Sequence, residues 1–473
     1  MSNQFQRSGE ACGVFGIYAP GERVSTLIYF GLLALQHRGQ ESAGIATSDG
    51  ETVTVYRDLG LVAQVFDEPT LAGLDGHVGI GHTRYSTTGS TIWENSQPVH
   101  RQSGRLSVAL GHNGNLTNTS ELAAQLGRGR GTSDSELMIE ALSREIDDSR
   151  SDERGLELAL SRVLPMFEGA FSLVLMDQGR LVGVRDPQGF RPLCLGSLEG
   201  GWALASETAA LDIIGARFVR EIGAGEMVVI DAGGVRSSWP FPAVDPHLCL
   251  FEFVYFARPD SQMYGRNIHG ARQEMGRRLA MEHPAEADIV VPVPESGIPA
   301  AQGYAAVSGL PYADGLVKNR YLGRTFIEPT QNMRDLGVRL KLNPIPENLA
   351  GRRVVLVDDS IVRGSTTHKL VTMLREAGAA EVHLRISSPP YRWPCFYGMD
   401  TSDRQSLIAF RMDEDGVRRE VGADSLGYLS LPGLLEATGV ADAGFCTACL
   451  SGTYPTDVSN AGGKDQLEEV RRP

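Results

Sequence analysis

The second half of this chain takes its fold from one stretch, Val354-Val355-Leu356-Val357-Asp358-Asp359-Ser360-Ile361-Val362-Arg363-Gly364-Ser365-Thr366-Thr367. Its apolar start predicts a buried parallel strand over 353–357, and the pattern after the glycine predicts a helix over 366–377. Open α/β sheets bind ligands at the carboxyl ends of their strands, where the two adjacent carboxylates lie. The first turn of a helix offers unpaired N–H groups to a phosphate, and carboxylates accept hydrogen bonds from sugar hydroxyls. The stretch therefore predicts a ribose 5-phosphate pocket rather than a simple helix cap.

The same run resembles the phosphoribosyl diphosphate motif of type I phosphoribosyltransferases. Ser365 stands where the amidotransferase branch of that family usually has threonine, and it keeps the hydroxyl donor. A second strand and turn, Val291 to Gly297, resembles the loop that faces the diphosphate. One Mg²⁺ per subunit is implied near this loop, because Mg²⁺ prefers oxygen ligands and often bridges substrate phosphates. The resemblance implies substrate binding by Asp358, Asp359, Ser360, Arg363, Gly364, Ser365 and Thr366, and Mg²⁺ binding near Ser296, Asp358 and Asp359.

Positive charge gathers between Lys318 and Lys341, with Arg320, Arg324, Arg334 and Arg339 between them. Such a run is often a solvated face, but here aromatic residues and prolines are interleaved with it. The segment Lys318–Ile327 resembles the family's flexible catalytic loop, which closes over phosphoribosyl diphosphate and excludes water. The resemblance implies that Lys318 and Arg324 bind this substrate.

Composition narrows the class of protein. The chain has 473 residues, so more than one domain is expected. Its formal net charge of −14 argues against a nucleic-acid partner. No apolar run approaches the ~20 residues of a membrane span, and the first eleven residues lack the apolar core of a secretory signal. We therefore expect a cytoplasmic protein without a membrane partner, whose six cysteines stay reduced.

The pattern of elements divides the chain. Residues 12–235 hold short strand-like runs such as 12–18, 53–56, 106–110, 171–176 and 181–185, with helices expected over 26–36 and 135–146. A proline-rich passage at 239–242 marks a linker, placed at 236–260. Residues 261–450 alternate helix and strand, with a helix over 269–282 and strands over 288–293 and 381–386, as in a parallel α/β domain. A polar tail over 451–473 is expected to fray.

Cys12 begins a strand near the start of the chain, where a lone cysteine is usually a small buried apolar residue. Three polar or glycine-rich segments favour a functional role for Cys12 instead, namely 36–44, 82–89 and 111–116, and we expect them to be functional loops. Together they make this half resemble the class II glutamine amidotransferase domain, an N-terminal nucleophile hydrolase with an αββα sandwich fold.

That resemblance assigns roles by position. Cys12 is the nucleophile, and its own α-amine is the base, with a reference pKa of ~7.7–8.0. The amine is free only if the bond after Ala11 is cut, so residues 1–11 are expected to be a propeptide. Arg84 is expected to hold the glutamine α-carboxylate, and Asn113 with the backbone N–H of Gly114 to form the oxyanion hole.

Asp134 is expected to pair with the glutamine α-amino group in the same resemblance. It could also act as the N-cap of the helix over 135–146, and both roles can hold together. His37, His82 and His112 are interpreted as structural, because the family mechanism needs no histidine base.

Four other cysteines form a separate constellation. Cys446 and Cys449 have Cys-x-x-Cys spacing, which favours a metal or redox site, while Cys249 and Cys395 stand apart. Spacing alone does not separate zinc from an iron–sulfur cluster. The resemblance implies one [4Fe–4S] cluster per subunit, with a structural role, as in the propeptide-containing branch. Cys194 is interpreted as core filling.

The two halves in this order resemble the amidophosphoribosyltransferase family. The implied reaction releases ammonia from glutamine and uses it to convert phosphoribosyl diphosphate to 5-phosphoribosylamine and pyrophosphate, the first step of purine synthesis. Purine nucleotide feedback and a homotetramer are implied in the same way. Two alternatives are weighed against it. Another class II amidotransferase would lack the Asp358-Asp359 motif, and a phosphoribosyl-diphosphate-sensing regulator would need a basic DNA-binding segment.

Overall fold

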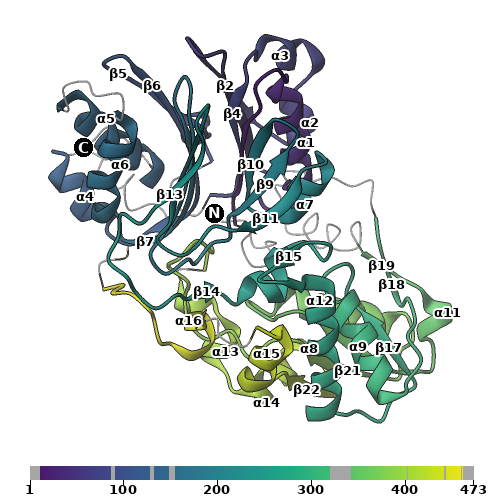
Figure 1. Ribbon diagram of the computed structural model, residues 1–473. Coiled ribbons are helices and arrows are strands. Elements are labelled where there is room, and N and C mark those ends of the chain that lie inside the picture. The colour runs from purple at the N-terminus through teal and green to yellow at the C-terminus, as the bar shows by residue number, and fades with distance from the viewer. Residues whose placement is uncertain are drawn as a thin grey trace.

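A computed structural model describes residues 11–86, 91–127, 133–148, 155–319, 342–401, 403–440, 444–459 and 461. Within these residues the chain forms two halves, seen above and below one another in Figure 1. The N-terminal half stacks two antiparallel sheets between layers of helices, and the C-terminal half is built on a parallel sheet.

The first sheet of the N-terminal half is antiparallel and has one face toward helices and one toward the second sheet. Phe15 and Ile17 pack with the helices, whereas Val14, which precedes Phe15, packs with residues of the second sheet. This is the two-residue alternation of a strand buried on both faces. In spatial order the strands are β11 (Arg217–Glu221), β9 (Cys194–Leu198), β10 (Gly201–Ala205), β1 (Gly13–Tyr18), β4 (Val78–Arg84), β2 (Ser42–Ser48) and β3 (Val53–Leu59). The helices beside it are α1 (Val24–Ala34), α2 (Val62–Val65), α3 (Glu68–Gly73) and α7 (Thr208–Ile213).

The second sheet faces the first and carries its own helical layer, so the N-terminal half has the four-layer αββα order (Figure 1). Leu173 and Leu175 pack toward the helices, and Val174 packs toward the first sheet. In spatial order its strands are β13 (Gly234–Ser238), β12 (Met227–Asp231), β8 (Leu181–Arg185), β7 (Gly169–Met176), β6 (Leu106–Leu116) and β5 (Val99–Ser103). Its helices are α4 (Thr119–Gln125), α5 (Asp134–Asp148) and α6 (Gly155–Val163), and the short helices η1 (Trp93–Asn95) and η2 (Leu164–Met166) lie in connections.

The C-terminal half centres on a parallel sheet whose order is β17-β20-β21-β22. Val354 and Leu356 pack on one face, and Val355 and Val357 pack on the other. Both faces are therefore covered, as a parallel sheet requires. The strands are β17 (Ile289–Pro292), β20 (Arg353–Asp358), β21 (Glu381–Ile386) and β22 (Ser425–Tyr428), and the main helices are α8 (Ile268–Glu282), α9 (Ile298–Ser308), α12 (Ser365–Glu376), α14 (Glu414–Val421) and α15 (Leu431–Thr438).

Smaller elements complete this half. Two-stranded pairs are formed by β14 (Leu248–Cys249) with β23 (Phe445–Cys446), β15 (Gln262–Met263) with β16 (Arg266–Asn267), and β18 (Leu316–Lys318) with β19 (Leu342–Pro344). Short helices are η3 (Glu252–Phe256), α11 (Pro346–Leu349), η4 (Arg404–Ser406), α13 (Ile408–Arg411) and α16 (Ala448–Ser451).

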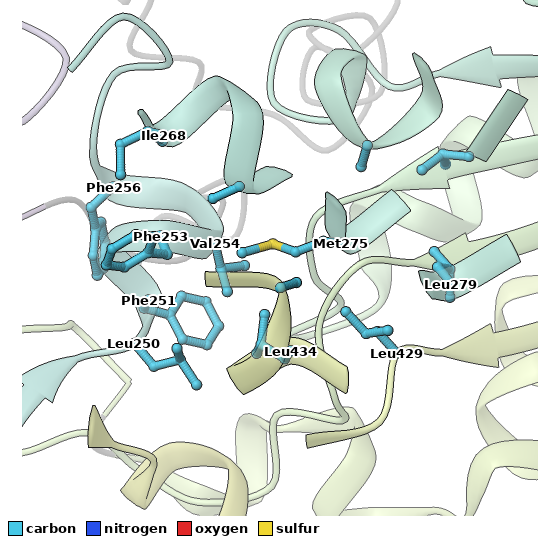
Figure 2. Close-up of a cluster of buried hydrophobic side chains, with 14 of the residues drawn as sticks. Leu250, Phe251, Phe253, Val254, Phe256, Ile268, Met275, Leu279, Leu429 and Leu434 are labelled. Carbon is cyan, nitrogen blue, oxygen red and sulfur yellow. The ribbon is translucent and has the colours of Figure 1, made fainter. Parts of the chain in front are cut away.

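Much of the predicted linker is part of this core. Residues 242–246 are exposed, but the segment from Leu248 through the π-helix η3 is largely buried. Figure 2 shows Phe253 and Val254 of this segment beside Met275 of α8 and Leu434 of α15. The exposed connection between the halves is therefore shorter than the predicted 236–260.

Candidate active sites

A pocket in the N-terminal half gathers most of the residues predicted to handle glutamine. Cys12 directly precedes β1 and Arg84 ends β4, and these strands are neighbours because Gly13 pairs with Thr83. Gly114 comes from β6 of the facing sheet, and Asp134 begins α5. The pocket therefore lies where the two sheets meet. It is lined by Cys12, Arg84, Tyr85, Gln97, His112, Gly114, Ser133 and Asp134.

The Cys12 thiol is buried and bonded to one backbone neighbour. Its Sγ lies 3.2 Å from the carbonyl oxygen of Tyr85 and 3.4 Å from the Tyr85 nitrogen. Burial raises the thiol pKa to about 11, although the Tyr85 backbone and the positive charge of Arg84 act in the opposite direction. At neutral pH the thiol is protonated in the uncut chain, so it needs a base to act as a nucleophile.

Arg84 is buried beside a second carboxylate that the sequence analysis did not single out. Its Nη1 lies 3.5 Å from Oε2 of Glu41. The same carboxylate accepts hydrogen bonds from the Ser86 N–H at 3.1 Å and from the Thr91 hydroxyl at 2.8 Å. Glu41 thus holds the guanidinium and the chain on both sides of residues 87–90. In the sequence, Glu41 of the segment 36–44 carried no signal for this role beyond its charge.

Asp134 is buried and ionised. Burial acts to raise its pKa, but nearby His112 and the backbone N–H groups of Leu116 and Ser135 outweigh burial, and the pKa is lowered overall. His112 Nδ1 lies 3.6 Å from Oδ2, and the Leu116 nitrogen lies 3.3 Å from it. Asp134 is the first residue of α5, and the helix cap comes from Ser133, whose hydroxyl accepts from the Glu136 N–H at 3.4 Å. The N-cap reading of Asp134 was therefore wrong by one residue, and its carboxylate is turned to the pocket edge instead.

Asn113 and Gly114 lie within β6, near its end at Leu116, and not in a loop. Both polar side-chain atoms of Asn113, Nδ2 and Oδ1, are buried, and neither has a hydrogen-bond partner among the described residues. A Cβ on Gly114 would lie 2.0 Å from the Ala170 carbonyl oxygen, so only glycine fits. The prediction that the segments 36–44, 82–89 and 111–116 are loops was wrong for residues 42–44, 82–84 and 111–116, which are strand residues of β2, β4 and β6. Asn113 directly precedes Gly114, which lines the pocket, and its unpaired buried amide is a donor available to an oxyanion.

The three histidines occupy structural positions. His37 Nε2 lies 2.7 Å from Glu207, outside the pocket. Burial lowers the pKa of His82 to about 3, so this ring is neutral, and its Nε2 lies 2.9 Å from the carbonyl oxygen of His112. His112 lines the pocket, but its ring contacts Asp134 and Ser135. Its position therefore orients the predicted amine-binding carboxylate.

The predicted ribose-phosphate site lies at the carboxyl edge of the parallel sheet. Strand β20 ends at Asp358, Asp359 follows it, and both residues are buried. The loop turns at Gly364, whose φ is +81° and where a Cβ would lie 2.5 Å from Ile408. Gly364 precedes α12 without a side-chain cap, which leaves the first turn for another acceptor. Arg363, Ser365 and Thr366 flank this glycine and are partly or fully exposed, and Ser360 bonds Asp359.

The Ser296 loop lies beside this site. Strand β17 pairs in parallel with β20, and Val293 donates to the carbonyl of Val357 at 2.8 Å. Gly297 packs so closely that a Cβ there would lie 2.4 Å from the same carbonyl oxygen. Lys318 ends β18, and its Nζ lies 3.3 Å from Glu295 of this loop. The structure thus brings Ser296 and Lys318 to the edge where Asp358 lies, whereas Arg324 and the rest of 320–341 lie outside the described residues.

The four candidate cluster cysteines converge at the junction of the halves. Cys249 and Cys446 are directly paired across β14 and β23, and Cys449 follows within α16. Cys395 packs against the buried apolar residues around Cys449 and Cys446, and its Sγ accepts from the Tyr397 N–H at 3.4 Å. Burial raises the pKa of Cys249 to about 11, and Cys395 acts in the same direction.

This arrangement bears on the kind of metal site. Across the residues that the structure describes, no three His, Cys, Asp or Glu side chains are grouped to share a single ion. Four cysteine thiolates are the donor set of both tetrahedral zinc sites and [4Fe–4S] clusters. The start of the polar tail is also attached here, because Tyr454 donates to the Pro394 carbonyl at 2.7 Å, so fraying from Gly452 onward was wrong for this part.

Three residues of the glutamine pocket were missed by the sequence analysis. Tyr85 bonds the nucleophile through its backbone, which any residue type could do. Gln97 accepts from the His112 N–H at 2.8 Å and donates to Ser135 at 3.0 Å. Ser133 caps α5. Of these, only Ser133 carried a sequence signal, the preference of serine for the N-cap position.

Fold and sites together define a two-domain enzyme class, a glutamine amidotransferase joined to a phosphoribosyltransferase. A family model described as a glutamine amidotransferase domain matches residues 82–212, and one described as a phosphoribosyl transferase domain matches residues 270–387. The amidophosphoribosyltransferase of Mycobacterium bovis is 54% identical, covering 98% of this chain and 90% of its own length. The chain belongs to the amidophosphoribosyltransferase family.

Two solved structures agree with this assignment and confirm the predicted fold class. The glutamine phosphoribosylpyrophosphate amidotransferase of Bacillus subtilis, in complex with ADP and GMP, matches with a TM-score of 0.89 and 43% identity, covering 96% of this chain and 100% of that one. A structure titled as the allosteric regulatory enzyme of purine biosynthesis matches with a TM-score of 0.90 and 44% identity, covering 96% and 99%. Among the described helices, none is both long enough and apolar enough to cross a membrane.

Proposed function

We propose that this chain hydrolyses glutamine in the N-terminal pocket and transfers the released ammonia to phosphoribosyl diphosphate in the C-terminal half. The products are glutamate, 5-phosphoribosylamine and pyrophosphate, and the reaction opens purine synthesis. The observation that carries the first half-reaction is the pocket itself. Its lining brings together a thiol, a guanidinium, a carboxylate and Gly114, and the side-chain amide of Asn113, which precedes Gly114, is buried without a partner among the described residues.

Glutamine binding follows from charge. Arg84 offers a planar guanidinium to the α-carboxylate, in competition with Glu41, and ionised Asp134 offers an acceptor to the α-ammonium group. The amide carbon of the substrate then faces Cys12. Attack by the thiolate forms a C–S bond, and the carbonyl oxygen gains negative charge. Asn113 Nδ2 and the Gly114 N–H stabilise that charge. Collapse expels ammonia, and water then hydrolyses the thioester to glutamate.

In the uncut chain this mechanism still needs a base that accepts the proton of the Cys12 thiol. Burial holds the thiol protonated at neutral pH, and His112 is directed to Asp134. A free α-amine on Cys12 would accept the thiol proton and return it to the leaving ammonia. We therefore propose that the Ala11–Cys12 bond is cut. Intact-mass measurement tests this, since fully active protein with an uncut N-terminus would contradict it.

In the second half-reaction ammonia attacks C1 of the ribose and the C1–O bond to pyrophosphate breaks. Asp358 and Asp359 accept from the ribose hydroxyls, and the loop 360–366 with the first turn of α12 holds the 5-phosphate. Ser296, Asp358 and Asp359 supply oxygen donors suited to Mg²⁺, which when bound would neutralise the leaving diphosphate. Lys318 lies at the same edge, and we assign Arg324 to substrate binding as well.

Four further parts of the proposal concern the protein as a whole. The cysteines Cys249, Cys395, Cys446 and Cys449 are proposed to hold one [4Fe–4S] cluster that fixes the junction of the halves. Its presence is tested by iron and sulfide content, and colourless protein containing zinc would contradict it. A homotetramer, purine nucleotide inhibition and a cytoplasmic location complete the proposal. The relative from Bacillus subtilis in complex with ADP and GMP supports nucleotide binding.

The experiment that tests the division of labour compares nitrogen sources. Cys12→Ala should lose synthesis from glutamine and keep synthesis from ammonia, because only the first half-reaction needs the thiol. Asp358→Asn should impair synthesis from both. Equal loss from both sources in Cys12→Ala would contradict two separable sites.

A further inference from the structure

Strand β6 carries Asn113 and Gly114 and is called the oxyanion strand. Residues Phe396–Gly398 of the C-terminal half contact it directly. The side-chain nitrogen of Asn115 donates to the carbonyl oxygen of Phe396 at 3.0 Å. A Cβ built on Gly398 would lie 3.3 Å from the carbonyl carbon of Gly114. The contacts fall on the residue assigned to the oxyanion hole and on its neighbour.

Arg191 holds the same segment from the other side. Its Nε and Nη2 donate to the Tyr397 carbonyl oxygen at 3.0 and 2.8 Å. Its Nη1 lies 3.3 Å from Glu252 at the start of η3. The Arg191 carbonyl in turn accepts from the hydroxyl of Ser172, which is the β7 partner of Asn113. The guanidinium is completely buried, so its geometry is fixed by these acceptors.

The fit leaves no room at Gly398. Its φ is +108°, and a Cβ there would lie 2.9 Å from Arg191 Nη2 as well as against Gly114. The ring of Tyr397 stacks on Phe190 with centroids 4.1 Å apart. The segment is therefore packed tightly between the oxyanion strand and Arg191. A methyl group added at Gly398 would displace either the strand or the Arg191 side chain.

We propose that the segment Phe396–Gly398 positions the oxyanion hole, so that glutamine hydrolysis in one half depends on how a loop of the other half is seated. This rests on the proposed function of Asn113 and Gly114. Gly398 and Asn115 are positioning residues, because they act through the backbone of Gly114 and touch no substrate. Oxyanion donors must meet the developing charge at hydrogen-bond distance, so a small displacement of the strand lowers kcat and leaves glutamine binding intact.

The test uses Gly398→Ala in the full-length chain. Loss of a whole oxyanion donor costs about 10²–10³ in kcat, so displacement should cost about ten- to a hundredfold in glutamine hydrolysis. The KM for glutamine and synthesis from ammonia should stay within about twofold. Alkylation of Cys12 by iodoacetamide, followed by peptide mass spectrometry, should be unchanged, because displacement of iodide develops no oxyanion.

Two further variants keep the test decisive. Asn115→Ala removes the bond to Phe396 without adding volume, and it should lower kcat selectively by about threefold or more. Gly309→Ala is the matched control, since Gly309 has a φ of +73° and no atom within 4 Å of its Cβ position. It should leave the glutaminase unchanged.

The outcomes separate this inference from the function beneath it. Wild-type glutaminase in both Gly398→Ala and Asn115→Ala would overturn the positioning role. So would a fall matched by equal losses in ammonia-dependent synthesis and in Cys12 alkylation, because that marks a general structural defect. Cys12→Ala is measured in parallel. If it still hydrolyses glutamine, the proposed function fails first, whatever the other variants do.

Discussion

Replacing Asn113 by leucine should make the protein more stable and its glutaminase much slower. Both polar atoms of the Asn113 side chain are buried and without a hydrogen-bond partner among the described residues, and the residue is 1% exposed. Burying an unpaired amide costs about 1–3 kcal/mol, and leucine has a similar shape without that cost. The free energy of unfolding should therefore rise by about 1–3 kcal/mol. Glutamine hydrolysis should lose about 2.7–4 kcal/mol of transition-state stabilisation, or about 10²–10³ in kcat.

The assays are urea unfolding and glutamate release, with ammonia-dependent synthesis as a check on the other site. Asn118→Leu is the matched control, since that side chain donates to Met166 O at 2.9 Å and accepts from the Glu168 N–H at 3.2 Å. Its replacement should destabilise the protein by about 1–3 kcal/mol and spare catalysis. If Asn113→Leu also loses stability and keeps its kcat, the amide has a structural role and the oxyanion assignment is wrong.

Three other substitutions test separate features. Asp134→Asn should raise the KM for glutamine about ten- to a hundredfold in steady-state assays, because a charged hydrogen bond to the substrate amine is lost. Burial raises the pKa of Asp186 to about 6, so the folded state keeps this proton to higher pH than the unfolded state does. Its contribution to stability is present below about pH 4 and falls by about 3 kcal/mol as the pH rises past 6. Over that range, urea unfolding should show the free energy of unfolding of Asp186→Asn rising relative to that of the wild type. Arg38→Met should lower the free energy of unfolding by about 3–5 kcal/mol, because Glu207 and Glu252 are then buried without their shared guanidinium. A variant that unfolds at the wild-type urea concentration would contradict this.

Much of the fold could be predicted from hydrophobic periodicity. Strand β21 begins and ends at the predicted residues, and β20 and α12 differ from prediction by one residue at their ends. These elements alternate clear apolar faces with short turns, so local sequence and tertiary packing agree. The residues 248–256 were harder, because an apolar segment after a proline-rich stretch gives no sign of which core it joins.

The candidate sites were harder to predict where polar residues lie inside strands. His82, Arg84 and Asn113 resemble loop residues by composition, yet β4 and β6 carry them between two sheets. Their backbone groups are paired by neighbouring strands, so side-chain polarity no longer decides the local structure. The carboxylate of Glu41 acts through contacts with Arg84 and Thr91, which only the folded chain brings together. A single sequence does not record such contacts.

The burial of Ala11 has a consequence for how the protein matures. Ala11 is 1% exposed and packs in a core cluster formed otherwise by residues of the C-terminal half. A protease in solution would find the proposed Ala11–Cys12 bond only in an incompletely folded chain. If cleavage instead needs the completely folded chain, the ratio of precursor to mature chain reports how much of the protein has folded. Mass spectrometry measures that ratio. Variants far from Cys12 that loosen the C-terminal core should then accumulate precursor.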